Sequence, residues 1–204
     1  MYDYLIYDFD GTLSDTYPIF TEAFLKMMEK YGIPQDYDTV YGFLKQSVGA
    51  AISNYDFPMS KKEARAEFEE IYQPIAVEKQ NLFPESEEIL RFGLSKNKKN
   101  YVYTHSGLWV YALLNRMGIR DCFDFVLDST YDFPRKPDPT ALNFMIEKCG
   151  IDKSKALMIG DRDLDIEVAH AAGIHACLID TDNFYPDLKS EYRIKTLSEL
   201  KEII

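Results

Sequence analysis

The sequence predicts an α/β fold with a mostly parallel sheet, interrupted after its first strand by a block that is entirely helical. Two observations predict this fold. Short apolar runs typical of buried strands alternate with segments of helical periodicity. The alternation stops between about residues 16 and 80, where helical signals occur without a convincing strand. Proteins of this class bind ligands at the carboxyl ends of their strands, so residues that follow a strand are the candidates for function.

Five segments have the length and apolar character of short buried strands. They cover residues 4–8, 100–104, 124–127, 156–159 and 176–179. The run "GLWVYALLNRMG" after Ser106 has apolar residues at helical spacing and stops at Gly118, a favourable residue just beyond a helix end. The run "DPTALNFMIEKCG" predicts a helix with Asp138 as its N-cap and Pro139 in its first position, ending at Gly150.

The helical block begins with "YPIFTEAFLKMMEKYG", whose apolar residues fall on one helical face before Gly32. Further along, Ser60 and Glu63 have the spacing of a capping box. Some 65 residues exceed what a strand-to-strand crossover needs, and long insertions often cover active sites. We therefore expect residues 1–15 and 81–204 to form a core domain and residues 16–80 to form a cap, or lid, although a long crossover would give the same pattern.

The composition disfavours several classes of protein. The apolar fraction of 46% and the charged fraction of 28% are ordinary for a globular protein, and no uncharged stretch approaches the length of a membrane helix. Asp3, Asp8 and Asp10 interrupt the only candidate for a signal sequence, so we expect a cytoplasmic protein. The net charge of −11 argues against nucleic acid as a partner. The three cysteines are far apart and predict reduced thiols rather than disulfides or a zinc site.

Aspartates cluster where two of the predicted strands end. Asp8 and Asp10 close the first apolar run, and in an extended chain they point the same way. Two like charges held together are costly unless a cation or a shared proton relieves them. Asp161, Asp163 and Asp165 follow the fourth strand, and hard cations such as Mg²⁺ take oxygen ligands of this kind. The pattern indicates a metal site, although each residue alone is also typical of a turn, a helix cap or a first helical turn.

Two further side chains fit a site for an anion. Thr104 ends the second predicted strand, where its hydroxyl could bond a phosphate oxygen, although a threonine in a strand is unremarkable by itself. Lys136 lies between Pro134 and Pro137, a rigid frame that is unusual for a surface lysine. The order acid pair, hydroxyl, lysine and acid cluster is hard to attribute to turns alone.

This order of motifs resembles that of the haloacid dehalogenase-like superfamily, in particular its phosphoglycolate phosphatase and β-phosphoglucomutase branch. Four motifs match in order: "DFDGTLSDT", the threonine of "YVYTHS", the lysine of "RKPDP" and the acids of "GDRDLD". The first is highly specific, whereas the second and third would mean little alone. The resemblance covers nearly the whole chain, with the helical block matched only by position and helical character. It implies a Rossmann-like three-layer core with an inserted α-helical cap domain.

The resemblance implies a Mg²⁺-dependent phosphatase that hydrolyses a small phosphomonoester, of the phosphoglycolate or sugar phosphate type, through an aspartyl-phosphate. Asp8 would attack phosphorus, and Asp10 would protonate the departing oxygen and then deprotonate the hydrolytic water. Mg²⁺ would be held by the Asp8 carboxylate, the Asp10 backbone carbonyl and Asp161, with Asp165 as a ligand or assisting through water. Lys136 would act beside Asp8 in the catalytic centre.

The resemblance also implies how phosphate is bound. Gly11 and Thr12 would let backbone N–H groups approach the phosphate, and Thr104 and Lys136 would complete its cradle. Mg²⁺ and Lys136 would bring positive charge into the acidic site, so that a phosphate binds despite the net charge of −11. His105 follows Thr104 where this branch frequently has asparagine, and it would either contact the substrate or pack.

Three departures from the family pattern bear on these roles. Arg162 stands where the family often has a small hydroxyl residue. The additional acid Asp163 leaves open whether Asp163 or Asp165 supports the metal. Glu85 replaces a glycine that is usual after the proline of "LFPES", where the chain would return to the core.

Two other functions are compatible with part of the pattern. A sugar-phosphate mutase of the β-phosphoglucomutase type tends to carry a lysine shortly after the second-motif hydroxyl, where this chain has Ser106, Gly107 and Leu108. A phospho-acceptor signalling domain similar to response-regulator receivers also combines acids, a hydroxyl, a lysine and Mg²⁺, but it places the acceptor on a middle strand and lacks a helical insertion. No motif identifies the substrate or the oligomeric state, and Lys45 could either meet a substrate anion or be solvated.

Overall fold

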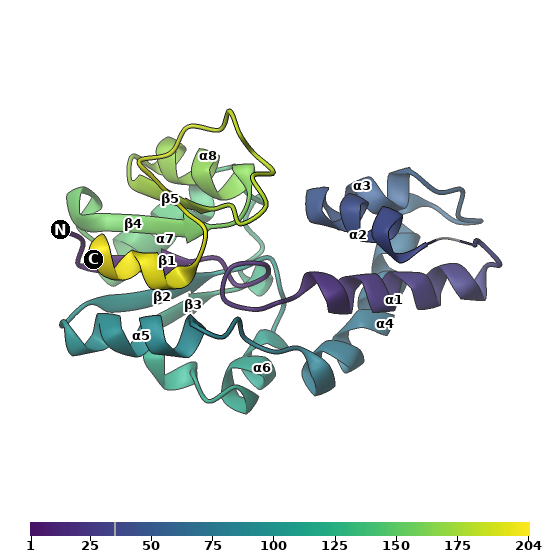
Figure 1. The fold of residues 1–204 in the computed structure, drawn as a ribbon, viewed down its shortest axis with the longest axis horizontal. Coiled ribbons are helices and arrows are strands. Elements are labelled where there is room, and N and C mark those ends of the chain that lie inside the picture. The colour runs from purple at the N-terminus through teal and green to yellow at the C-terminus, as the bar shows by residue number, and fades with distance from the viewer. Residues whose placement is uncertain (35) are drawn as a thin grey trace. The chain divides into compact units, whose positions relative to one another are not determined.

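The computed structural model describes residues 1–34 and 36–204, which form two compact units (Figure 1). The first unit consists of Met1–Ser14 and Leu82–Ile204, and the second consists of Asp15–Asn81. Within the described residues, no helix combines the length and the apolar character that crossing a membrane requires. Each unit has a hydrophobic core of its own, and each is described separately below.

The first unit is built on a six-stranded sheet in which every neighbouring pair of strands is parallel. The strands lie in the order β3-β2-β1-β4-β5-β6. They span Tyr4–Tyr7 (β1), Lys99–Tyr103 (β2), Phe125–Leu127 (β3), Ala156–Gly160 (β4), His175–Ile179 (β5) and Tyr192–Ile194 (β6). The predicted α/β fold with a mostly parallel sheet is confirmed. The sequence analysis did not predict β6, because this edge strand has only three residues and Arg193 between its ends is exposed.

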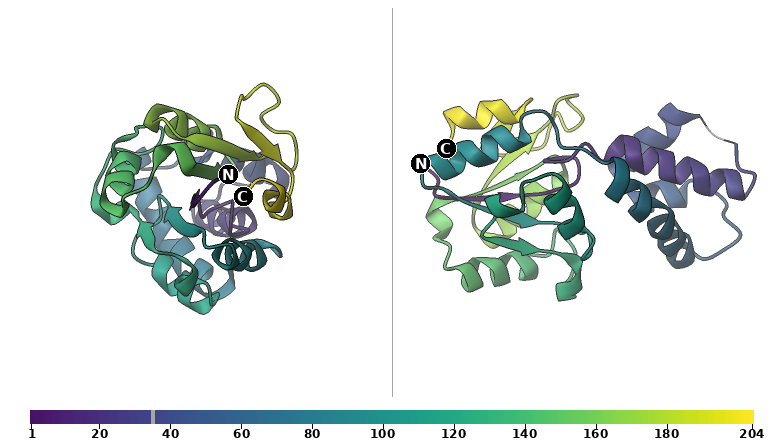
Figure 2. Two further views of the ribbon diagram at one scale, coloured as in Figure 1. Left: turned by 90° about the vertical axis from the view of Figure 1, so that its left-hand side faces the viewer. Right: turned by 90° about the horizontal axis from the view of Figure 1, so that it is seen from below.

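Helices cover both faces of this sheet, which gives the three layers of a Rossmann-like core (Figures 1 and 2). On one face, α7 (Thr140–Cys149) and α8 (Asp163–Ala172) pack their apolar side chains against Ile6, Met158 and Leu178. On the other face lies α5 (Ser86–Ser95), where Gly93 comes close to Leu5. Because successive side chains of a strand point to opposite faces, the continuous apolar runs of these strands serve two cores.

The remaining helix of the first unit is α6 (Val110–Arg116), and four short 3₁₀ turns complete its secondary structure. Gly118 and Gly150 have positive φ angles of 70° and 63° just after α6 and α7, as the sequence predicted for these helix ends. The prediction of Asp138 as N-cap was wrong by one residue, because Pro139 occupies that position and its carbonyl accepts the first helical hydrogen bond. Asp138 still accepts a hydrogen bond from Thr140 N–H.

The register of the central strands brings distant parts of the chain together at one edge of the sheet. Tyr7, the last residue of β1, lies opposite Val102 of β2 and Ile159 of β4. The next residue continues the pairing, since Asp8 N–H donates a hydrogen bond to the Ile159 carbonyl. Residues that follow β1, β2 and β4 therefore meet at the carboxyl ends of three neighbouring strands, where this class of fold binds its ligands.

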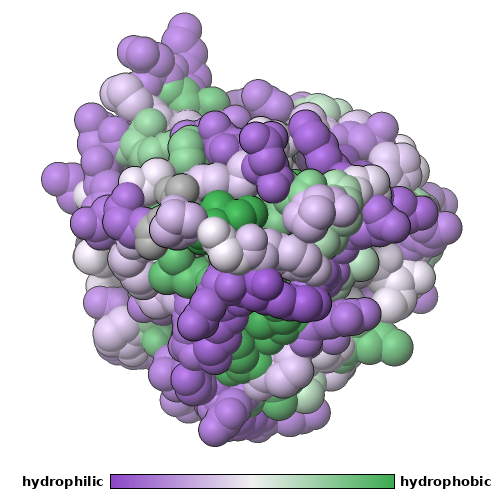
Figure 3. All heavy atoms as spheres, turned by 90° about the vertical axis from the view of Figure 1, so that its right-hand side faces the viewer, coloured by the Kyte–Doolittle hydropathy of each residue, from purple (hydrophilic) through white to green (hydrophobic). Residues whose placement is uncertain are grey.

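The second unit contains helices only among its described residues. These are α1 (Tyr17–Lys30), α2 (Tyr37–Gln46), α3 (Val48–Ser53) and α4 (Lys61–Lys79). Its core is rich in aromatic rings, among which Phe68 stacks on Tyr72 with an interplanar angle of 4°. The predicted capping box at the start of α4 is present, with Ser60 and Glu63 each accepting a hydrogen bond from the other's backbone N–H. Figure 3 shows hydrophilic side chains over most of the face that it presents, with hydrophobic patches between them.

A buried polar network ties the beginning of the second unit to its end. Tyr72 donates to Oε1 of Gln80 at 2.6 Å, and Gln80 Nε2 donates to the Thr16 hydroxyl at 2.9 Å. In the backbone, Asp15 N–H donates to the Asn81 carbonyl at 3.0 Å. The chain therefore enters and leaves this unit at adjacent points.

Candidate active site

Asp8, Lys136 and Asp165 form a buried charged group at the carboxyl edge of the sheet. Lys136 Nζ donates to Oδ1 of Asp8 and to Oδ1 of Asp165, at 2.7 Å in both cases, and to the Tyr103 carbonyl at 2.9 Å. The same Nζ lies 4.4 Å from the centre of the Tyr103 ring. These contacts satisfy the three donors of the ammonium group and hold it at one place.

Each member of this group is supplied by a different part of the fold. Asp8 follows β1 directly, Asp165 lies in the first turn of α8 after β4, and Lys136 lies in the loop between β3 and α7. The Asp165 carboxylate is fixed further by Arg162 N–H, which donates to its Oδ2 at 3.2 Å. Gly160, at the end of β4, leaves the space that this side chain occupies, because a Cβ atom there would lie 2.3 Å from both Cβ and Cγ of Asp165.

Replacement of Gly160 with alanine is expected to displace Asp165 from Lys136. We expect the variant to lose about 1–3 kcal/mol of stability, as overpacked interiors do. Because Asp165 is a candidate metal ligand, affinity for Mg²⁺ should fall at least about tenfold. Gly42→Ala is the matched control, since nothing lies within 4 Å of the added Cβ. Chemical denaturation and Mg²⁺ titration of both variants test the expectation, and equal behaviour of the two would contradict it.

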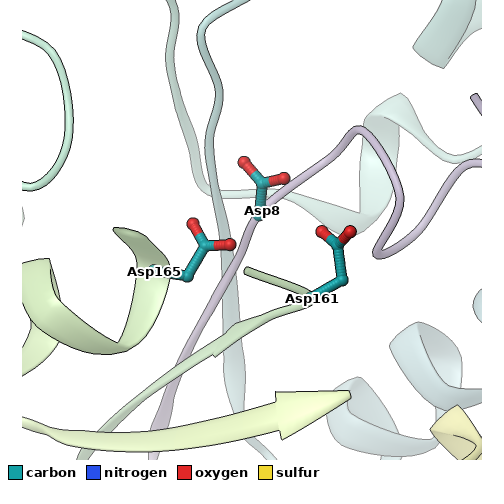
Figure 4. Close-up of side chains that lie close together, drawn as sticks. All are labelled: Asp8, Asp161 and Asp165. Atoms are coloured by element: carbon teal, nitrogen blue, oxygen red, sulfur yellow. The ribbon is translucent and has the colours of Figure 1, made fainter. Parts of the chain in front are cut away.

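Asp161 joins Asp8 and Asp165 in a group of carboxylates that could hold a metal ion (Figure 4). One oxygen from each of the three lies within 4.8 Å of the others. The Thr12 hydroxyl donates to Oδ1 of Asp161 at 3.1 Å and so links the first motif to the last. When ionised, these three carboxylates carry three negative charges against the single positive charge of Lys136. A divalent cation would balance the difference, and all-oxygen ligands suit Mg²⁺.

The structure places Asp163 apart from this carboxylate group. Its Oδ1 accepts a hydrogen bond from Leu164 N–H in the first turn of α8, whereas Asp165 is buried and paired with Lys136. Of the two acids that the sequence left open, Asp165 is the one in the group of carboxylates that could hold a metal ion.

The electrostatic environment shifts the pKa values of two of these groups, Asp8 and Lys136. Burial raises the pKa of Asp8 well above its ordinary value of 3.8; Lys136 opposes the shift, and the neighbouring acids Asp165, Asp161 and Asp10 add to it. Burial alone would lower the pKa of Lys136, but the charges of Asp165 and Asp8 outweigh it and raise the pKa. Lys136 therefore stays charged, whereas ionisation of Asp8 depends on the positive charge close to it.

The carboxylate of Asp10 lies among hydroxyl groups rather than in the carboxylate group around Asp8. Oδ2 of Asp10 accepts from the Ser106 hydroxyl at 2.8 Å and from the Thr104 hydroxyl at 3.4 Å. The chain turns between Phe9 and Ser14, where Leu13 N–H and Ser14 N–H both donate to the Phe9 carbonyl. The expectation that Asp8 and Asp10 point the same way assumed an extended chain; in the structure Asp8 accepts from Lys136, whereas Asp10 accepts from the two hydroxyls.

Two predicted phosphate contacts have partners within the protein. Gly11 has a φ of 83°, which favours glycine, but its N–H donates to the Ser14 carbonyl at 2.9 Å. This geometry does not support the expected contact of the Gly11 N–H with phosphate. His105 Nε2 accepts a hydrogen bond from Lys136 N–H at 3.1 Å, so His105 holds the backbone of the lysine loop.

Other residues from the sequence analysis lie outside the cluster. Arg162 hydrogen-bonds to Tyr185, and Lys45 of the second unit lies over the ring of Tyr41, 5.8 Å from its centre. Sequence reasoning missed Ser106, which it used only to argue against a mutase. Its position two residues after Thr104 was the available signal, since a polar side chain there follows the same strand.

Comparisons with known proteins agree with the fold. The sequence profile of the family described as "Haloacid dehalogenase-like hydrolase" matches residues 5–179. A phosphoglycolate phosphatase from Nitrosococcus oceani is 28% identical, covering 98% of this chain and 93% of that protein. The crystal structure of a hydrolase from Streptococcus pneumoniae TIGR4 is similar with 32% identity and a TM-score of 0.65, covering 86% of this chain and 91% of the other. A haloacid dehalogenase-like family hydrolase from Streptococcus pneumoniae has the same fold, with a TM-score of 0.87 at 19% identity, covering 99% and 98% of the two chains.

Proposed function

The chain belongs to the haloacid dehalogenase-like hydrolase family and is a phosphatase of that family, and from this premise we propose that it hydrolyses a small phosphomonoester with the help of Mg²⁺, through an aspartyl-phosphate on Asp8. The observation that carries the proposal is the contact of Lys136 with both Asp8 and Asp165, beside a third carboxylate. Phosphoglycolate, the substrate named for the relative from Nitrosococcus oceani, is one candidate among such esters.

Asp8, Asp161 and Asp165 are the residues that would hold Mg²⁺, together with the backbone carbonyl of Asp10. Their oxygen-only donor set and their excess negative charge fit a hard divalent cation. When bound, Mg²⁺ would neutralise charge on the phosphate and favour the ionised form of Asp8.

Asp8 is the nucleophile in this proposal. A carboxylate oxygen of Asp8 forms a bond to phosphorus while the ester P–O bond breaks, and Asp10 gives its proton to the departing oxygen. In the second step a water molecule attacks phosphorus, its proton passes to Asp10, and the bond between Asp8 and phosphorus breaks. Lys136 holds Oδ1 of Asp8 throughout and stabilises negative charge in a buried site.

The remaining site residues orient the phosphate and support the centre. The Thr104 hydroxyl can reach a phosphate oxygen if it leaves Asp10, to which its hydrogen bond is long at 3.4 Å. Thr12 holds Asp161, and we keep its backbone N–H as a candidate phosphate donor. We retain Gly11 for its positive φ only. His105, whose Nε2 accepts the Lys136 N–H, remains a candidate substrate contact.

The second unit is proposed as a lid that selects the substrate, in the division of residues 1–15 and 81–204 from residues 16–80 that the sequence predicts. Long insertions next to a catalytic centre commonly exclude water and complete the site. A cytoplasmic location and the absence of a nucleic-acid partner stay predictions.

The function is tested by measuring phosphate release from a panel of phosphorylated metabolites and from 4-nitrophenyl phosphate, with Mg²⁺ and with EDTA. We expect turnover that requires Mg²⁺ and is highest for one small ester. A folded protein that releases no phosphate from any ester would overturn the proposal. Conversion of β-glucose 1-phosphate faster than its hydrolysis would instead indicate a mutase.

The metal assignment is tested separately, by thermal unfolding. At a concentration roughly 100 times its Kd, Mg²⁺ should raise the Tm of the wild-type protein by on the order of 5–10 °C. Asp165→Asn is expected to lose most of this increase, and Asp163→Asn, the same change two residues away, to keep it. The opposite result for the two variants would show that Asp163 supports the metal.

A further inference from the structure

Ser106 is a buried serine in the loop after β2 to which the proposed mechanism gives no role. Its hydroxyl donates a hydrogen bond of 2.8 Å to Oδ2 of Asp10, a length typical of a good O–H···O bond. Thr104 donates to the same oxygen over 3.4 Å. Of the two hydroxyls, Ser106 makes the closer contact with the carboxylate that is proposed to transfer the proton.

The backbone around Ser106 fixes the position of this hydroxyl. Ser106 N–H donates to the Thr104 hydroxyl oxygen at 3.0 Å, and the Ser106 carbonyl accepts from Ser129 N–H at 3.0 Å. The residue is thus anchored on both sides, to the end of β2 and to the loop after β3. A hydrogen-bond donor held in this way is preorganised, because little conformational entropy remains to be lost during the reaction.

The same contacts indicate different roles for the two hydroxyls, with Thr104 donating to the phosphate and Ser106 donating to Asp10. A hydroxyl has a single proton to donate, and the oxygen of Thr104 already accepts the Ser106 N–H. When Thr104 donates its proton to a phosphate oxygen, as its proposed role requires, its contact with Asp10 is lost. The hydrogen bond from Ser106 to Asp10 does not compete with the phosphate in this way.

We propose that Ser106 is a positioning residue for Asp10, holding Oδ2 and so orienting the carboxyl group that exchanges the proton. This inference rests on the proposed function. In the first step the bond between Asp8 and phosphorus forms, the ester P–O bond breaks, and the proton of the Asp10 carboxyl group moves to the departing oxygen. The carboxylate that remains accepts the Ser106 hydrogen bond, which is stronger for the charged form than for the acid.

The test compares two substrates that differ in their need for a proton. Phenol is a poorer leaving group than 4-nitrophenol, so cleavage of phenyl phosphate depends more on Asp10 than cleavage of 4-nitrophenyl phosphate does. With enzyme in excess, release of the phenol in a single turnover reports formation of the aspartyl-phosphate alone. We expect Ser106→Ala to slow phenol release at least about tenfold and 4-nitrophenol release less than about threefold. The larger effect falls on the substrate whose leaving group depends more on general acid catalysis.

Four further proteins control the comparison, counting the Asp10→Asn variant and its combination with Ser106→Ala. Ser129→Ala keeps the backbone hydrogen bond to Ser106 and should leave both rates unchanged. Ser106→Thr retains a hydroxyl and should restore most of the phenol release. In an Asp10→Asn background, Ser106→Ala should have no further effect, because the proton that Ser106 helps to place is absent. Melting temperatures of all variants show that each is folded at the assay temperature.

The possible outcomes separate the inference from the function on which it rests. Equal slowing of both substrates by Ser106→Ala, an unchanged rate of phenol release, or a further loss in the Asp10→Asn background would each overturn the role of Ser106 while the phosphatase stands. If Ser106→Ala does not fold, Ser106→Thr provides the test. A Ser106→Thr variant that does not discriminate between the two substrates as wild type does would then overturn the role of Ser106. Wild-type protein that releases neither phenol nor phosphate would overturn the proposed function and this inference with it.

Discussion

Asp8→Asn is expected to abolish turnover, with a loss on the order of 10⁴-fold or more, because an amide cannot replace the attacking carboxylate and no other step can substitute for formation of the covalent intermediate. The variant should also form no phosphorylated protein when mixed with substrate and quenched in acid, whereas intact-mass measurement of the wild type should show one added phosphoryl group. Asp163→Asn, with the same change outside the carboxylate group, should remain active. An Asp8→Asn protein as active as the wild type would contradict the mechanism.

Although it should abolish activity, Asp8→Asn should increase the stability of the metal-free protein. The folded-state pKa of Asp8 is raised above its ordinary value of 3.8, so folded protein holds this proton at pH values where unfolded protein has lost it. The stability that the protonated carboxyl provides is present below pH 3.8 and is lost as the pH rises through the raised pKa. Asp8→Asn removes this dependence. In EDTA at neutral pH we therefore expect Asp8→Asn to unfold at a higher temperature than wild type, and an unchanged or lower Tm would show that burial of Asp8 has no such cost.

Lys136→Met is expected to reduce both stability and activity strongly. Removing one partner from a buried ion pair costs about 3–5 kcal/mol, because the other charge is left uncompensated, and here Lys136 is paired with two buried carboxylates. The loss of positive charge next to the attacking group should lower kcat by about 10²–10³-fold. Urea denaturation and steady-state kinetics measure the two effects.

Lys155→Met is the matched control for this change. Lys155 is also paired with an aspartate, Asp3, but its side chain is 53% exposed, and surface ion pairs contribute at most about 1 kcal/mol. The expected difference in stability between the two variants reflects the burial of Lys136 and its second carboxylate partner. Equal stability of the two variants would show that the acids around Lys136 are neutralised in another way, for example by protonation of Asp8.

The parallel sheet and the alternation of strands and helices along the chain could be predicted from sequence because the signals are local. A strand buried on both faces is a continuous apolar run, and the glycines after α6 and α7 end those helices through their own φ angles. The strand β6 carries no such signal: it is an edge strand of three residues with an exposed arginine in the middle, and only its pairing with β5 defines it.

The candidate site also contains residues that local sequence signals identify and residues that only the folded structure identifies. Asp8 and the acids after β4 were recognisable because they follow apolar strands whose ends meet at one edge of a parallel sheet, whereas Lys136 was recognised from its flanking prolines and from the resemblance. The choice between Asp163 and Asp165 was not, because it depends on which side of α8 faces Lys136 and on the space that Gly160 leaves. Ser106 was overlooked because a serine in a loop has no pattern of its own, and its importance comes from the turn that carries Asp10.

The adjacency of Asp15 and Asn81 has a consequence for how such an enzyme can diversify. The two ends of the helical segment are joined by a backbone hydrogen bond, and the residues that flank them, Ser14 and Leu82, pair with each other. A foreign segment whose ends lie equally close could therefore be grafted at this junction. The graft would leave the parallel sheet and its buried lysine untouched. Recombination at this junction would exchange the segment that we propose selects the substrate and would keep the residues of the candidate site.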